Sequence, residues 1–319
     1  MREYTIGPND AGQRLDSFLG KAAPGLGSSL IQKLVRTKKV KVNGKRAEPS
    51  QRLSLGDLVN LYVYEERLAE WTRKPAEAPP EVSVVYEDEN ILLADKPQGM
   101  LAHPDDEGRD TDTLIARIQS YLRLKGEWDP ERENSFAPAL CNRIDRNTGG
   151  LVIAAKNAAA LREMNEAIRR RQVEKRYLCV VQGEMEHKTG RLENYLRRDT
   201  AQKRVYVDRE KSAENRTAVT EYRVLAYQDG LSLLEVRLIT GRTHQIRAQM
   251  AAAGHPLLGD GKYGRNDQNR GLTMQALYAW QVTFHLEKEG PLGYLAGRRF
   301  RVERVPFAEA FGVSLGEKT

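Results

Sequence analysis

The densest group of chemically capable residues lies at 141–151, Cys-Asn-Arg-Ile-Asp-Arg-Asn-Thr-Gly-Gly-Leu. Its single acid, Asp145, stands between Arg143 and Arg146 and is followed by a polar Gly-Gly turn. A carboxylate that neighbouring arginines keep charged can attack or stabilise the anomeric carbon of a sugar. The same residues also suit a structural Asp–Arg pair at the start of a strand, and composition alone favours that simpler interpretation.

A second pattern, Gly259 to Gly264, matches the G-x-G-x-x-G of dinucleotide sites. That mechanism requires a strand before the glycines and a helix after them, so that pyrophosphate meets a helix N-terminus. Here a predicted helix and Gly254-His255-Pro256 come first, and the polar residues 265–271 follow without helical periodicity. We therefore predict that the glycines shape a loop that closely approaches another group. A nucleotide-cofactor enzyme would rest on this pattern alone.

Signatures of several common reactions are missing from the chain. It has no G-x-x-x-x-G-K-[ST], no H-E-x-x-H and no G-x-S-x-G, so phosphoryl transfer, zinc hydrolysis and serine hydrolysis lose their usual marks. The two cysteines, Cys141 and Cys179, form no C-x-x-C pair, so neither a zinc ribbon nor a redox motif is indicated. We expect side chains to supply the chemistry, with no cofactor and no metal.

Composition narrows the class of protein. The chain has 319 residues and 40% hydrophobic content, enough for a substantial core and for two domains or one domain with an appendage. The low number of cysteines, two, is typical of a protein in a reducing compartment. The first ten residues lack the apolar stretch of a secretory signal. No apolar run approaches the ~20 residues that a membrane-spanning helix requires. We expect a soluble cytoplasmic protein. The net charge of +7 favours a polyanionic partner, although an ordinary basic surface would give the same total.

The chain divides at residues 64–80, a charged stretch that ends in Ala-Pro-Pro. Proline cannot continue a helix and forces the preceding residue into extended geometry, so this stretch is predicted to be a linker. It separates an N-terminal unit, 1–63, from a C-terminal unit, 81–319. In the N-terminal unit, apolar spacing predicts two helices, and Asn43-Gly44 predicts a hairpin turn because both residues tolerate positive φ.

Basic residues of the N-terminal unit gather on its second helix and on the hairpin that follows. No acid interrupts the stretch from Gln32 to Ala47, a pattern typical of RNA- or DNA-binding surfaces, although most charge runs are solvated helix faces. The unit resembles the S4-like RNA-binding domain through Arg14-Leu15-Asp16, the helix at 29–36, and Val40 to Gly44 with Gly56-Asp57. This resemblance implies that five cations contact RNA: Lys33, Arg36, Lys38, Lys39 and Lys41.

Strands and helices of the C-terminal unit do not alternate regularly. Neighbouring strands with interspersed helices indicate an α+β fold with a mixed, largely antiparallel sheet, and the N-terminal unit adds a small α/β domain. Strands are predicted at 82–86, 91–94, 151–155, 177–182, 217–228, 231–239, 275–285 and 297–303, and helices at 113–124, 158–171 and 243–253.

Five ordered motifs of the C-terminal unit resemble those of the RluA-type pseudouridine synthases. The motifs occur in the family's order over about residues 82–303. A chance match to five ordered motifs is far less probable than a chance match to one of them. The resemblance implies a pseudouridine synthase-like fold and an RNA enzyme that detaches uracil from ribose, rotates it and rejoins it through carbon, without cofactor or metal. The motifs are Asp95–Gly99 with His103-Pro104, Asn142–Leu151, Lys175–Val180, Thr240–Arg247, and Gly254–Gly264.

The same resemblance assigns roles to individual residues. It implies that Asp145 acts at the sugar or glycosidic bond, that Tyr177 stacks on the target base and handles a proton, and that Arg247 pairs with Asp145. The target base must leave its stack to reach such an acid. Arg143 would help displace the nucleotide. The remaining residues implied to contact RNA are Arg242, His244 and Gln245.

One residue departs from the family pattern, and two alternatives stay open. Asn142 replaces the usual histidine; it can hydrogen-bond but cannot titrate near neutral pH, and we interpret the position as structural. We expect a monomer that acts on structured RNA, with large-subunit ribosomal RNA ahead of transfer RNA. The main rival from another class is a catalytically silent RNA-binding protein or ribosome assembly factor.

Overall fold

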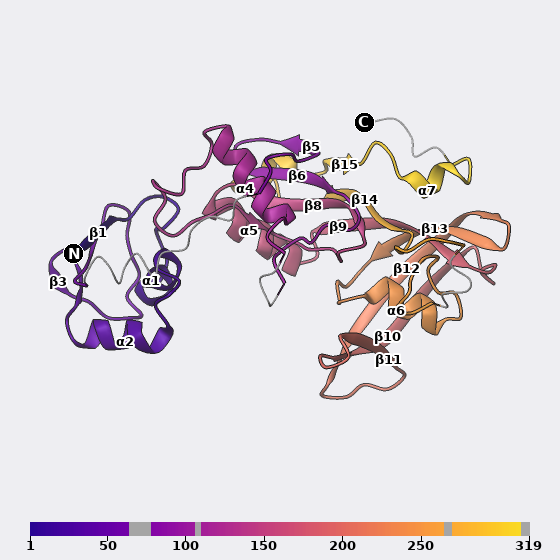
Figure 1. Ribbon diagram of the computed structural model, residues 1–319, viewed down its shortest axis with the longest axis horizontal. Coiled ribbons are helices and arrows are strands. Elements are labelled where there is room, and N and C mark those ends of the chain that lie inside the picture. The colour runs from indigo at the N-terminus through magenta and orange to yellow at the C-terminus, as the bar shows by residue number, and fades with distance from the viewer. Residues whose placement is uncertain (64–77, 106–109, 265–269, 314–319) are drawn as a thin grey trace.

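The structure, a computed structural model, describes residues 1–63, 78–105, 110–264 and 270–313. These residues form a four-stranded sheet near the N-terminus and an eleven-stranded sheet in the rest of the chain. Figure 1 shows the small sheet with its two helices at one end of the long axis, and strands β10 and β11 at the other. Residues 64–77 of the predicted linker lie outside the described residues, so the predicted boundaries stay a prediction.

The N-terminal unit is an antiparallel sheet, in the order β1-β4-β2-β3, with two helices packed against it. Leu15, Phe18 and Leu19 are fully buried, as the helical spacing of apolar residues predicts. Asn43 and Gly44 have φ of 51° and 73°, which confirms the hairpin turn. The elements are β1 Arg2–Thr5, α1 Leu15–Ala22, α2 Ser28–Arg36, β2 Val40–Val42, β3 Lys45–Arg46 and β4 Leu58–Leu61.

The large sheet runs in the order β11-β10-β12-β13-β9-β14-β8-β6-β5, with β15 beside β14 and β7 beside β8. Of the strand pairs described, β8 with β14 alone is parallel, which confirms a mixed, largely antiparallel sheet. Its strands are β5 Val84–Glu87, β6 Ile91–Lys96, β7 Ala139–Leu140, β8 Gly149–Ala155, β9 Val173–Gln182, β10 Thr189–Asp199, β11 Arg204–Asp208, β12 Asn215–Gln228, β13 Leu231–Leu238, β14 Leu277–Phe284 and β15 Arg299–Arg301.

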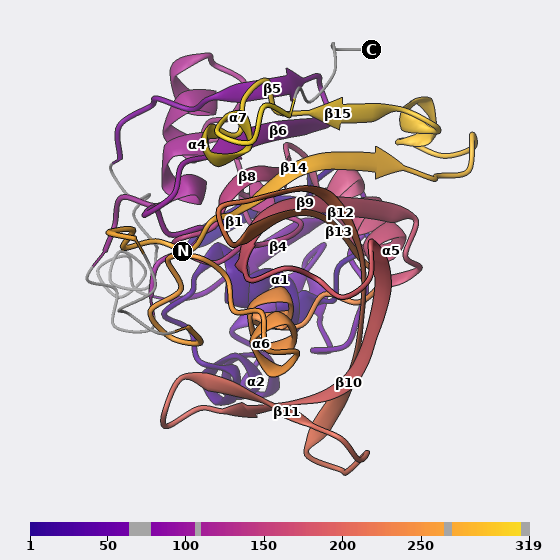
Figure 2. The same ribbon diagram turned by 90° about the vertical axis from the view of Figure 1, so that its right-hand side faces the viewer.

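Helices cover both faces of this sheet. One face buries Leu92, Val152 and Tyr177 beneath α4 and α6, while the other buries Leu93 and Leu178 against α5 and the C-terminal segment. Successive strand residues point to opposite faces, so each central strand contributes to both cores. Helix α6 packs against β10, β11 and β12 (Figure 1), on the concave side of the curve that these strands make in Figure 2. The helices are α4 Leu114–Leu124, α5 Ala158–Arg169, α6 Gln245–Ala252, the 3-10 turn η2 Gly293–Leu295, and α7 Pro306–Glu309.

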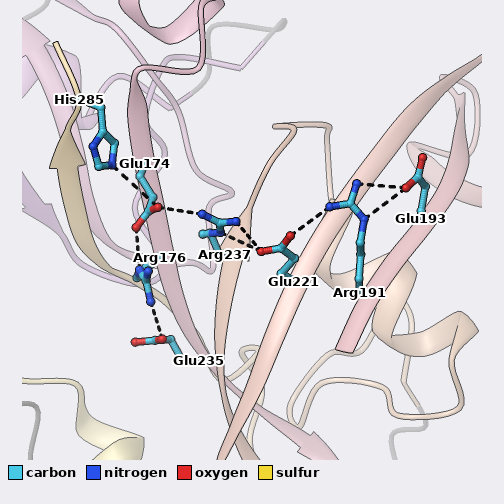
Figure 3. A network of polar contacts seen from close by, with 8 residues as sticks. All are labelled: Glu174, Arg176, Arg191, Glu193, Glu221, Glu235, Arg237 and His285. Atoms are coloured by element: carbon cyan, nitrogen blue, oxygen red, sulfur yellow. Dashed lines mark hydrogen bonds and ion pairs between the residues drawn. The ribbon is translucent and has the colours of Figure 1, made fainter. Parts of the chain in front are cut away.

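The sequence pattern misses β10 and β11, because these strands bury little apolar surface; along β10 only Leu196 is buried. Charged pairs instead join β10 to the rest of the sheet: Arg191 donates to Glu221 on β12 at 3.0 Å, and the network continues through β13 to β9 (Figure 3). Glu235 accepts from Arg176 at 2.7 Å, and Glu221 accepts from Arg237 at 2.7 Å. Cross-strand ion pairs of this kind stabilise a sheet where apolar contacts are few. The network comprises Glu174, Arg176, Arg191, Glu193, Glu221, Glu235, Arg237 and His285.

The N-terminal unit is attached to the large one through polar contacts. Asp10, 1% exposed, accepts hydrogen bonds from Asn134 at 2.8 Å and from Ser135. Asn9 accepts from the backbone N–H of Ala158, the first residue of α5, at 3.0 Å. A buried carboxylate must be hydrogen-bonded, and Asp10 meets this requirement partly through side chains of the large unit.

Candidate active site

The predicted catalytic carboxylate lies in the turn between β7 and β8. The side chain of Asp145 is 28% exposed, and its backbone carbonyl accepts from the N–H of Thr148 at 3.0 Å. Gly150 has φ of 111°, and a Cβ there would stand 2.2 Å from the carbonyl oxygen of Ala279. Glycine is therefore required for the turn to reach β14. Asn142 accepts from the N–H of Ile153 at 2.8 Å, a contact that supports its structural interpretation.

Arg247 joins Asp145 to a second aspartate. Its Nη1 donates to Asp145 Oδ2 at 2.9 Å, while Nε and Nη2 donate to the two oxygens of Asp260 at 2.7 and 2.9 Å. Burial opposes the charge of Arg247, but the two carboxylates hold its pKa above its ordinary value. Asp145 Oδ1 accepts no hydrogen bond from the described part of the chain. One carboxylate oxygen is therefore held, and the other is open to a substrate.

Asp260 is the functional residue that sequence reasoning left without a role. Its side chain is fully buried, and burial alone would raise its pKa, but Arg247 keeps that pKa below its usual value. Asp260 lies in the glycine pattern at 259–264. A Cβ on Gly259 would stand 2.1 Å from the carbonyl oxygen of Met274, which confirms the predicted close approach. The 13-residue separation from Arg247 gave no periodicity from which the pair could be predicted.

His244 also faces Asp145. It adopts the left-handed conformation, with φ of 51°, immediately before α6, so this helix begins two residues later than the sequence predicts. Its Nε2 lies 3.7 Å from Asp145 Oδ2, and its Nδ1 lies 2.8 Å from the hydroxyl of Tyr263. Burial lowers the pKa of His244, with the nearby Arg247 adding to the effect and Asp145 opposing it. The imidazole is therefore neutral near pH 7.

Tyr177 lies on β9 and is 7% exposed. Burial, and then the charge of Asp145, raise the pKa of its phenol, so it stays protonated at neutral pH. Tyr177 is thus a neutral aromatic side chain, close enough to Asp145 for the charge of that carboxylate to raise the pKa of the phenol.

Lys96, at the end of β6, ties the loop after it to the catalytic turn. The side chain is fully buried, and Nζ donates to the carbonyls of Pro97, Met100 and Arg146 at 2.9, 2.8 and 3.0 Å. Burial lowers the pKa of Lys96 to about 8, although the carboxylate of Asp145 opposes the shift. The sequence placed this lysine in a motif, but nothing in the pattern indicated that its three partners come from two loops.

The other predicted RNA contacts of the large unit differ in exposure. Arg143 and Arg242 are exposed, and Arg242 donates to the carbonyl of Thr217 at 3.2 Å. Gln245 is 3% exposed, and its amide bonds internally, to Thr240 at 2.8 Å and to the carbonyl of Val219 at 3.0 Å. A buried, satisfied amide favours positioning of the 240–245 turn over direct contact with RNA.

The predicted RNA-binding cations of the N-terminal unit form a separate surface on α2 and the residues after it. Lys33, Arg36, Lys38 and Lys39 are exposed, and Lys41 is half-buried. None of the five forms an ion pair with a residue inside the described ranges. Unpaired cations in such density are available to phosphates.

Two other kinds of site were sought in the described residues. No three His, Cys, Asp or Glu side chains there stand close enough together to hold a metal ion. No helix within those same ranges has the length and apolar character to cross a membrane.

The fold and this site define the class of RNA-modifying enzymes that isomerise uridine. The family model of RNA pseudouridylate synthase matches residues 90–252, and that of the S4 domain matches residues 13–59. The chain belongs to the RNA pseudouridylate synthase family and is an RNA isomerase with an N-terminal S4 domain. This confirms both resemblances that the motifs indicated.

Several relatives are similar along most of the chain. A ribosomal large subunit pseudouridine synthase D of Yersinia pestis is 32% identical over 294 residues, 88% of this chain and 86% of that protein. An uncharacterized RNA pseudouridine synthase of Aquifex aeolicus is 34% identical over 259 residues, 79% of this chain and 77% of that one. Among solved structures, human RNA pseudouridylate synthase domain containing 4 has a TM-score of 0.56 at 19% identity and covers 72% of this chain and 90% of its own, a likeness of fold.

Proposed function

We propose that this enzyme converts uridine to pseudouridine in the ribosomal RNA of the large subunit, in the cytoplasm, with Asp145 as its catalytic carboxylate. The geometry at Asp145 carries the proposal: Arg247 holds Oδ2 at 2.9 Å, and Oδ1 accepts no hydrogen bond within the described residues. A carboxylate fixed at one oxygen and open at the other is suited to act on a ribose. The family, and the similarity to large-subunit pseudouridine synthases such as synthase D of Yersinia pestis and synthase C of Escherichia coli, support ribosomal RNA as substrate.

The reaction is balanced within the nucleoside. The N1–C1′ bond breaks, the uracil turns, and C5 bonds to C1′; the C5 proton is then lost and N1 gains one. No oxidant or reductant is consumed. Asp145 would act at the sugar, at C1′ or an adjacent ribose carbon, as the N1–C1′ bond breaks. Arg247 would keep the carboxylate of Asp145 in place. Tyr177, a buried phenol near Asp145, is placed by the proposal against the detached base.

Binding and chemistry would be shared between the two units. We assign RNA backbone contacts to Lys33, Arg36, Lys38, Lys39 and Lys41, and displacement of the target nucleotide to the exposed Arg143. Flipping a uridine costs a few kcal/mol of stacking, which aromatic and arginine contacts must replace. The contacts of Asp10 with Asn134 and Ser135 support concerted binding by both units. We propose that the enzyme acts as a monomer and needs no small-molecule cofactor for RNA binding or catalysis.

Pseudouridine mapping over total RNA, with and without the gene, tests the proposal. We expect loss of one or more pseudouridines from large-subunit ribosomal RNA, regained when the wild-type gene is restored. Loss confined to transfer RNA would contradict the substrate. No change in any RNA would contradict the activity and favour a catalytically silent RNA-binding protein.

A further inference from the structure

The glycine-rich loop at 259–264 contacts both groups that face the catalytic carboxylate. Asp260 accepts two hydrogen bonds from Arg247, and Tyr263 bonds to His244. The guanidinium of Arg247 also lies 5.2 Å from the ring centroid of Tyr263, within cation–π distance. The loop thus reaches the site through two side chains, neither of which touches Asp145 within hydrogen-bond distance.

We infer that this loop positions the active site: Asp260 fixes Arg247 and Tyr263 fixes His244, so that both face Asp145 in one orientation. The inference rests on the proposed function and adds two positioning residues to it. It also accounts for the glycine pattern that resembles a dinucleotide motif, since the glycines let the loop approach its neighbours.

Asp260 accepts hydrogen bonds from two of the three guanidinium nitrogens of Arg247, and the third donates to Asp145. Asp260 uses both of its oxygens on Nε and Nη2, in the side-by-side geometry that a guanidinium offers a carboxylate. The loop backbone fixes Asp260 in turn, because the N–H groups of Lys262 and Tyr263 donate to Oδ1 at 3.0 and 3.2 Å. With the plane of the guanidinium fixed in this way, one of the two N–H bonds of Nη1 points to Asp145 Oδ2.

The hydroxyl of Tyr263 is the hydrogen-bond partner of His244 Nδ1, and its role in that bond decides which nitrogen of the imidazole carries the proton. The hydroxyl oxygen of Tyr263 accepts from the backbone N–H of Val205 at 2.9 Å, and its own hydrogen has His244 Nδ1 as an acceptor at 2.8 Å. If Nδ1 accepts, the proton of the neutral imidazole lies on Nε2. That N–H faces Asp145 Oδ2 across 3.7 Å, too far for a hydrogen bond, so it remains available to an oxygen of the substrate.

Two conservative substitutions test the loop. Asp260→Asn removes the charge and one acceptor but keeps the shape, and Tyr263→Phe removes only the hydroxyl. We expect each to lower kcat about 10- to 100-fold, with KM and RNA affinity within about twofold of wild type, because small displacements of a catalytic group have effects of this size. The readout is single-turnover pseudouridine formation, well below the melting temperature of each variant.

Matched controls make the same chemical changes elsewhere. Glu235→Gln removes the charge of a side chain 9% exposed that pairs with Arg176 on the opposite face of the sheet (Figure 3). Tyr121→Phe, on α4, removes a hydroxyl that donates to Glu87 at the end of β5 at 2.9 Å. Both controls should keep the kcat of wild type. Loss of kcat in the controls to the same extent would mean that general destabilisation explains the loop variants, and would overturn the inference.

A double-variant comparison separates positioning from a merely structural role. In an Arg247→Gln background, Asp260→Asn should cause no further loss of kcat, because Asp260 acts through Arg247. Additive losses, or loop variants that retain kcat, would overturn the inference while leaving the proposed function intact. Absence of pseudouridine with wild-type enzyme would instead overturn the proposed function.

Discussion

Arg247 Nη1 lies 2.9 Å from Asp145 Oδ2, although 102 positions separate the two residues in the chain. The contact joins the turn before β8 to the start of α6, two elements on the same face of the sheet. The two side chains differ in exposure: that of Arg247 is 10% exposed and that of Asp145 is 28% exposed. The ion pair is therefore neither fully exposed on the surface nor fully buried. An arginine that is almost enclosed thus presents its charge to a carboxylate that substrate can reach.

Removing the arginine should destabilise the protein as well as stop catalysis. Arg247→Met leaves the fully buried carboxylate of Asp260 without its partner, and losses of about 3–5 kcal/mol in the free energy of unfolding are usual for such a change. Arg191→Met, on an arginine that is 52% exposed, should cost less than about 1 kcal/mol. Chemical denaturation of both variants checks this. Equal losses would contradict the assignment of Asp260 and Arg247 as a buried pair.

The cations of α2 should govern RNA affinity and its dependence on salt. The double variant Lys33→Gln/Arg36→Gln should bind ribosomal RNA more weakly, with the slope of log K against log salt reduced by about one for each phosphate that the variant no longer neutralises. Its kcat at saturating RNA should match wild type. Arg169→Gln/Arg170→Gln removes the same charge where both arginines pair with Glu166, and should change the slope little. Identical slopes in the two double variants would show that net charge alone is responsible.

Gly259 should tolerate no side chain, whereas a glycine of similar φ in open space should. Gly259 and Gly230 have φ of 78° and 74°, but a Cβ on Gly259 would meet the carbonyl of Met274 at 2.1 Å, and one on Gly230 would meet nothing within 4 Å. Alanine at either position should cost about 1–2 kcal/mol through its backbone conformation. Gly259→Ala should lose about 1–3 kcal/mol more through overpacking, and its kcat should fall. Thermal unfolding and pseudouridine formation, measured side by side, check both expectations.

The titration of His244 should appear in the pH dependence of stability. Burial, Arg247 and Lys262 lower its pKa, against Asp145 and Asp260, so the unfolded chain binds more protons near pH 6.5 than the folded one. Its contribution to the free energy of unfolding is therefore complete above about pH 7 and is lost as pH falls from about 6.5 to the lowered pKa.

Denaturant midpoints at a series of pH values measure this contribution. His244→Gln should remove part of the loss of stability between about pH 7 and pH 5. A wild-type curve that coincides with that of His244→Gln would show that His244 is protonated equally in the folded and unfolded states.

Local chemistry made much of the fold predictable. Asn43-Gly44 indicated a turn because few residues accept positive φ, and both do so in the structure. The apolar run Leu151 to Ala155 indicated a strand buried on both faces, and every residue of β8 is buried. Strands β10 and β11 lack such a run. Charged pairs join β10 to β12 through Arg191 and Glu221 (Figure 3) and β10 to β11 through Arg197 and Asp208, and such pairs leave no apolar pattern in the sequence.

The candidate site divides in the same way. Asp145 and Arg247 stood out because their motifs were dense and ordered, and the structure brings them together. Asp260 and Tyr263 belonged to a loop that was predicted to approach another group closely, but nothing in the pattern indicated which group. Their contacts with Arg247 and His244 depend on how α6 packs, which no spacing along the chain indicates. Lys96 was within a motif too, but its three carbonyl partners follow only from the tertiary fold.

The most direct test of the central claim uses purified enzyme and large-subunit ribosomal RNA transcribed without modifications. Wild-type enzyme should form pseudouridine at a specific position, and Asp145→Asn should form none while binding the RNA within about twofold of wild type. The amide keeps the size of the side chain and can still accept from Arg247, so loss of product would report the missing charge. Pseudouridine formed by Asp145→Asn at a rate near that of wild type would contradict the claim.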